Sequence, residues 1–97
     1  MRISIPSAAA ATLLDILGQS RFQKVYDTIS QQDGYYRVTM QNLSPYNVYF
    51  ESGDPATVNE GTKVVPNSFF SFATDNLAKV SLLAETADAT NVRISIT

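Results

Sequence analysis

The sequence predicts a mostly β domain: a sandwich or small barrel of about eight short strands with one N-terminal helix. Two observations support this prediction. Apolar and polar residues alternate with period two along most of the chain, and turn signals recur about every 8–12 residues. The 97 residues form one domain, residues 1–97, because this length suits one core and is too short for two. Apolar residues make up 44% of the chain, including five Tyr and five Phe, which is enough to fill that core.

The N-terminal third contains the one expected helix. Residues 2–5 alternate and predict a short strand. Ser7 is a favourable N-cap residue, residues 8–17 are strong helix formers, and Gly18 stands where a C-cap glycine belongs. Residues 22–29 then predict a strand with weak alternation.

The rest of the chain predicts strands only. Asp33 and Gly34 indicate a tight turn, because both residue types tolerate a positive φ. The clearest half-buried strand follows, with Tyr36, Val38 and Met40 on one face. The remaining strands are expected at residues 36–41, 46–51, 63–65, 68–73, 80–82 and 92–96.

The composition argues against an enzyme. The chain has no His and no Cys, so it cannot form a disulfide, a thiol nucleophile or a Ser-His-Asp arrangement. A small glycan-active enzyme using two carboxylates would need two acids to converge in one pocket. Most of the nine acids lie in predicted turns, where Asp is favoured for local reasons. Residues 51–61 are rich in oxygen ligands but lack the regular spacing of a calcium loop. We therefore expect no catalytic residue, no cofactor and no metal.

The charge pattern argues against nucleic acid and membrane as partners. The formal net charge is −2, and the seven basic residues are scattered, with Arg21 and Lys24 the closest pair. Nucleic-acid binding usually requires a basic cluster. No uncharged apolar run is long enough to span a bilayer. The apolar stretch at residues 8–17 contains Asp15 and follows Pro6, unlike a signal sequence, so we expect an unprocessed N-terminus.

Four apolar residues stand on the face of their strands that the alternation predicts to be outward. They are Tyr35, Tyr49, Phe69 and Leu83. Several such residues on separate strands can form a contiguous patch, and exposed apolar patches mark protein contacts. The alternative is that the helix and long loops cover both sheet faces. The pattern leaves both possibilities open, and these four residues are the candidate protein interface.

Several segments resemble those of small structural proteins of phage virions. They are AATLLDILG at residues 10–18, YRVTMQN at 36–42, NVY at 47–49, TVNEG at 57–61, the stretch 64–72, LLAETAD at 82–88 and NVRISI at 91–96. The chain departs from that pattern at Glu51-Ser52, where a glycine is usual, and at Pro66-Asn67, which replaces a turn of small residues.

The resemblance implies a jelly-roll-like β-sandwich that acts as a bacteriophage capsid cement (decoration) or head-accessory protein. Such proteins bind the major capsid protein at the virion surface after assembly in the host cytoplasm, commonly as homo-oligomers (trimers) at local three-fold positions. There they bridge and stabilise neighbouring capsid subunits. The alternative function is a carbohydrate- or receptor-binding accessory module at a virion vertex or tail. Exposed tyrosines could stack on sugar rings there, although the chain has no Trp.

Overall fold

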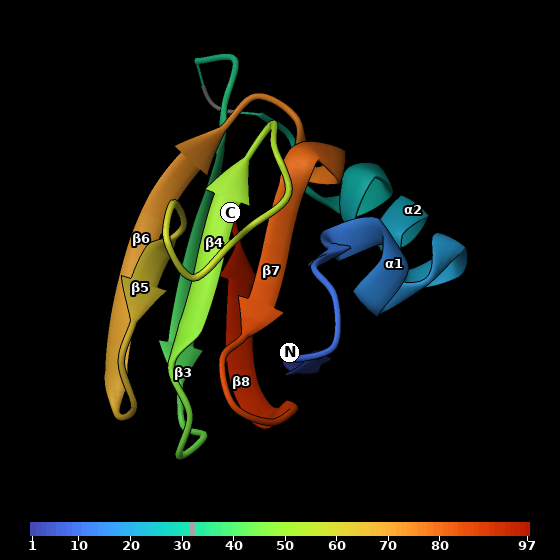
Figure 1. Cartoon of the computed structure of the whole chain (residues 1–97). Coiled ribbons are helices and arrows are strands. Elements are labelled where there is room, and N and C mark those ends of the chain that lie inside the picture. Colours follow the sequence, from blue (N-terminus) through green and yellow to red (C-terminus); the bar gives the residue numbers. More distant parts are fainter. Residues whose placement is uncertain (32) are drawn as a thin grey trace.

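A computed structural model describes residues 1–31 and 33–97 and shows two four-stranded antiparallel sheets packed face to face (Figure 1). The predicted mostly β sandwich is therefore confirmed. The first sheet contains, in spatial order, β1 (Arg2–Ile5), β8 (Ala89–Ile96), β3 (Tyr36–Asn42) and β6 (Ser68–Thr74). The second sheet contains β2 (Ala11–Thr12), β7 (Val80–Ala84), β4 (Val48–Ser52) and β5 (Thr62–Val64).

The strand order is that of a jelly roll. β1 pairs with β8, β2 with β7, β3 with β6 and β4 with β5, so the chain forms one long antiparallel ribbon. Rolling this ribbon adds the pairs β3–β8 and β4–β7, which complete the two sheets. The inward side chains of both sheets form one core, in which Val38 and Met40 of the first sheet and Val48 and Leu82 of the second are fully buried.

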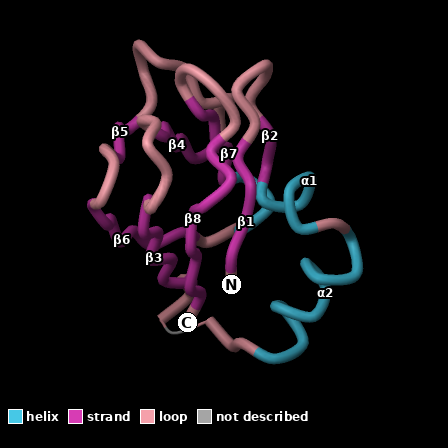
Figure 2. Tube along the Cα trace, turned by 90° about the horizontal axis from the view of Figure 1, so that it is seen from below, coloured by secondary structure: helices cyan, strands magenta, loops and turns pink. Residues whose placement is uncertain are grey.

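Two short helices cover one side of the sandwich. α1 (Leu13–Leu17) and α2 (Gln19–Thr28) lie on the side opposite β5 and β6, as both views show (Figures 1 and 2). A short 3-10 helix, η1 (Leu77–Lys79), precedes β7. Leu13 and Leu17 of α1 and Phe22 and Val25 of α2 are buried against the core. No helix in the described ranges has the length and apolar character needed to cross a membrane.

The predicted strand at residues 22–29 is wrong, because most of this segment belongs to α2. Phe22 and Val25 are buried, and Tyr26 and Ile29 pack against the core beside them. This spacing of three, four and seven residues is helical, and it is the pattern that a weak alternation concealed. The expectation of a single helix is therefore also wrong.

The expected helix at residues 8–17 begins later than predicted. Thr12 is the N-cap: its Oγ1 accepts a 3.2 Å hydrogen bond from the Asp15 amide, and the Asp15 carboxylate accepts one from the Thr12 amide. Ser7 instead donates through its amide and hydroxyl to Asp88, at 2.9 and 3.0 Å. Residues 11–12 form β2, a strand that the helix-forming composition did not indicate. Gly18, with a positive φ of 81°, ends α1 and begins α2.

The remaining strand predictions are confirmed, with ends shifted by a few residues. The predicted tight turn is also present, because Asp33 and Gly34 have φ values of 56° and 84°. The described residues contain eight strands, as predicted, because β2 takes the place of the incorrect strand at residues 22–29.

Candidate interaction surface

The four candidate interface residues lie on two different sheets and do not form one patch. Phe69, 73% exposed, lies on β6, and Tyr35, 54% exposed, directly precedes β3, so both belong to the first sheet. Tyr49 and Leu83 are direct register partners on β4 and β7 of the second sheet. Tyr49 is only 4% exposed and Leu83 is half-buried.

The expectation that Tyr49 is exposed is wrong, because the loop after β4 covers the outer face of the second sheet. Ala56 of this loop is buried, and its amide donates a 3.0 Å hydrogen bond to Ser81 Oγ on β7. Gly61 lies so close to the sheet that a Cβ there would stand 3.0 Å from Tyr49 Cβ and 2.7 Å from the Thr57 carbonyl oxygen. For the second sheet, the alternative that a loop covers the face is correct.

The Tyr49 side chain is held by a small polar network. Its hydroxyl donates to Glu85 Oε2 at 3.1 Å, and Asn47 Nδ2 donates to the same oxygen at 2.8 Å. Burial raises the pKa of Tyr49, and the hydrogen bond to Glu85 and the negative charge of Glu85 raise that pKa further. The network therefore stabilises the covered arrangement and leaves Tyr49 outside any surface that a partner could reach.

The outer face of the first sheet, in contrast, is open. Its outward side chains are exposed or half-buried: Arg2, Ser4, Arg37, Thr39, Gln41, Phe69, Ser71, Ala73, Arg93 and Ser95. One register row crosses all four strands and consists of Arg2, Arg93, Gln41 and Phe69. In the next row, Thr39 Oγ1 and Ser71 Oγ lie 2.8 Å apart. We call this face, defined by the ten residues above, the open face.

The open face gathers basic residues that are far apart in the sequence. None of its four strands contains Asp or Glu, whereas they carry Arg2, Arg37 and Arg93. Met1 lines both a surface hollow of about 240 Å³ that includes Arg93 and one of about 330 Å³ that includes Arg21 and Lys24 of α2. Five of the seven basic residues therefore lie on this side of the molecule. This cluster could not be predicted from the spacing of basic residues in the sequence, because only the pairing of β1 with β8 places Arg2 opposite Arg93.

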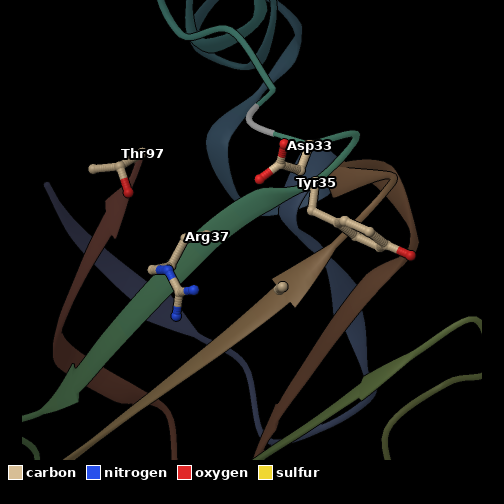
Figure 3. Close-up of a pocket in the computed structure, with 5 residues that line it drawn as sticks. Asp33, Tyr35, Arg37 and Thr97 are labelled. Atoms are coloured by element: carbon tan, nitrogen blue, oxygen red, sulfur yellow. The ribbon is translucent and has the colours of Figure 1, made fainter.

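A small polar cavity lies at one end of the open face. Asp33, Tyr35, Arg37, Ala73 and Thr97 line it (Figure 3). Figure 3 shows the Tyr35 ring pointing away from the Arg37 guanidinium, with Asp33 above them. The cavity volume of about 110 Å³ is well below the roughly 300–1,000 Å³ of small-molecule sites, so it fits a water or a single side chain of a partner.

The described residues contain no group of three or more acidic, His or Cys side chains arranged to hold a metal ion. In comparisons with known proteins, no family model, no curated protein and no solved structure matches this chain. The open face is thus the candidate functional site. Of the predicted interface residues, Phe69 lies on this face and Tyr35 lines the cavity at its end, and both are exposed.

Proposed function

We propose that the chain is a non-enzymatic structural protein of a phage particle, a capsid cement (decoration) protein that binds neighbouring capsid subunits through its open face. The resemblance of its segments to small virion proteins supports this proposal. The jelly roll supports it by analogy alone, since the fold is frequent in viral capsid proteins but also occurs in lectins.

The observation that carries the proposal is the contrast between the two sheets. The chain covers the outer face of the second sheet with its own loop and leaves that of the first exposed, with Phe69 and three arginines on it. Aromatic and Arg side chains are enriched at the centres of protein interfaces. The hollow of about 240 Å³ on this face is smaller than the roughly 300–1,000 Å³ of small-molecule sites, so the face suits another protein surface better than a small substrate.

The mechanism follows from this surface. A protein that contacts two neighbouring subunits buries additional surface, which must be exposed again before the subunits separate. The arginines select a partner surface rich in acidic residues and accelerate encounter with it. Because exposed charges are screened by salt, the attachment should weaken as ionic strength rises.

Binding to capsids tests the proposal directly. Particles purified from the source host should contain the chain in many copies, as determined by quantitative mass spectrometry. Purified protein should co-sediment with capsids stripped of it, and Arg93→Glu combined with Arg37→Glu should reduce binding by about tenfold or more, since each reversal replaces attraction by repulsion. Lys63→Glu, an exposed reversal on β5 of the second sheet, is the matched control and should bind as wild type. Absence of the chain from particles, or equal binding of all variants, would contradict the proposal.

Carbohydrate or receptor binding is the second candidate function. One observation favours it: Tyr35 is 54% exposed at the rim of the small polar cavity, and an exposed aromatic ring can stack on a sugar ring. A glycan array probed with wild type and with Tyr35→Ala tests this role. A signal lost in the variant would favour it over capsid binding, and no signal would count against it.

A further inference from the structure

The free edge of β6 differs from the other three edges of the described sandwich. Proteins protect sheet edges by short strands, charges, bulges or a covering element. β2 has two residues, β5 has three and carries Lys63, and β1 contains a register shift and contacts α1. β6 has seven residues, SFFSFAT, with no charge and no proline, and its seven register pairs with β3 contain no shift. None of the usual protections is present on it.

The hydrogen-bond pattern shows which backbone groups of β6 point outward. Arg37 and Thr97 exchange both of their backbone hydrogen bonds at 2.9 Å, so the amide and carbonyl of Arg37 point toward β8. Backbone groups alternate along a strand, so Val38 and Met40 point toward β6 and bond with Phe72 and Phe70. The alternate residues of β6 therefore direct their amide and carbonyl groups to the free edge. They are Phe69, Ser71 and Ala73.

Two phenylalanines of β6 are also more exposed than is usual for this residue type. Phe70 and Phe72 point inward and contact Phe50, with ring centroids 5.1 and 4.3 Å apart, yet Phe70 remains 39% exposed. Phe69 on the other face is 73% exposed. In Figure 1 β6 forms the outer margin of the molecule on the side away from the helices, and no described segment lies beyond it.

We propose that two copies of the chain pair through β6, antiparallel and about a two-fold axis at Ser71. This register places Ser71 opposite Ser71 of the second copy and Phe69 opposite Ala73, so every outward amide and carbonyl finds a partner. Phe70 then lies opposite Phe72 of the second copy, which covers both half-exposed rings. The two first sheets become one continuous sheet of eight strands.

The edge itself indicates that a second copy is the occupant. Phe70 and Phe72 flank Ser71 on either side, and the strand carries no charge, so self-pairing opposes no like charges. The contact uses the same surface on both copies and closes at two, unlike the three-fold assembly implied by the resemblance. A seven-residue strand is about 23 Å long. A contact along a single strand edge is small beside the roughly 1,200–2,000 Å² of stable interfaces, so we expect the dimer to depend on concentration.

Single-cysteine cross-linking tests the register, because the chain has no native cysteine. In Ser71→Cys the two Cα atoms should lie about 5.5 Å apart, within disulfide reach. In Ala73→Cys they should lie about 13 Å apart along the strands, beyond that reach. Mild oxidation should therefore cross-link the first variant and not the second, with Ser95→Cys on β8 as an exposed control. Cross-linking of Ala73→Cys as efficient as that of Ser71→Cys would overturn the proposed register.

Charged substitutions of Ser71, which lies on the proposed two-fold axis, test whether the partner is a second copy of the chain. Ser71→Lys should weaken the wild-type dimer about fivefold or more, since two like charges then face each other, and mixing it with Ser71→Glu should restore pairing. Light scattering from about 1 mM to about 1 μM spans the affinities of weak contacts. It should show the wild type reaching twice the 10.6 kDa of one chain. A monomer throughout, or a trimer, would overturn the inference. The result is independent of the proposed function, because Arg93→Glu should leave this dimer intact.

Discussion

At the scale of a single residue, Tyr49 predicts that the stability of this protein depends on pH. Its hydroxyl lies under the loop after β4 and donates to Glu85, and burial followed by this carboxylate raises its pKa above the usual value of about 10. The unfolded chain therefore loses this proton at a lower pH than the folded chain. Because the folded state then binds more protons, we expect its stability to fall as pH rises above about 10.

We expect the Tyr49→Phe variant to have a smaller loss of stability at alkaline pH than the wild type. Burial also raises the pKa of Tyr26, so the slope of unfolding free energy against pH should become less steep rather than disappear. Urea unfolding followed by circular dichroism between about pH 8 and 11 measures the slope. Tyr35→Phe, which removes an exposed hydroxyl, is the control and should change the slope less. A Tyr49→Phe slope equal to that of the wild type would show that the raised pKa does not affect folding.

Helix capping is decided by the structure around the N-terminal segment rather than by residue preference. Ser7 and Thr12 are both suitable N-cap residues, and each precedes helix-forming residues. The segment between them is needed to reach β7, where Ala11 and Thr12 pair with Leu82 and Ser81. The helix can therefore begin only after Thr12, and Ser7 bonds to Asp88 instead.

Removing the cap hydroxyl should destabilise the protein more than removing the other hydroxyl. We expect Thr12→Ala to lower the free energy of unfolding by about 1 kcal/mol, because the Asp15 amide loses its acceptor. Ser7→Ala, which removes an exposed hydrogen bond, should cost about 0.5 kcal/mol or less. Chemical denaturation of both variants measures the difference. The reverse order would mean that Ser7 and Asp88 anchor the segment more strongly than the capping box does.

The elements that were predictable are those with a strong local pattern. β3 alternates so regularly that its inward and outward residues were assigned correctly from sequence. α2 was not predicted, because its apolar residues, spaced by three and four, also fit a weak alternation over eight residues. β2 has only two residues and forms because β7 lies beside it, so it leaves no signal of its own.

At the scale of the whole molecule, the candidate site depends on pairings that local sequence does not encode. Phe69 and Tyr35 could be predicted as outward because alternation is local. The burial of Tyr49 could not, because a loop placed by Ala56 and Gly61 covers it. The basic cluster could not be predicted either, because Arg2 and Arg93 come together only when the two ends of the chain pair. A chain with scattered charges can therefore still present one basic, acid-free sheet face.

The same ribbon topology predicts how the chain folds. Phe50 on β4 pairs with Thr62 on β5 across a short loop, whereas Arg2 on β1 must meet Arg93 from the far end of the chain. Closing a longer loop costs more entropy, so the ribbon should form from the β4–β5 end and add β1 and β8 last. Refolding should take milliseconds to seconds, as in other proteins dominated by non-local pairing.

Two matched core substitutions test this order. Val48 on β4 and Val92 on β8 are both fully buried, so Val48→Ala and Val92→Ala should each cost about 2 kcal/mol. If the β4 end forms first, Val48→Ala should slow refolding about tenfold, whereas Val92→Ala should mainly accelerate unfolding. Stopped-flow circular dichroism over a range of urea concentrations separates the two rates. Refolding slowed equally by both substitutions would mean that the chain ends pair before the rate-limiting step, and the ribbon would then form as a whole.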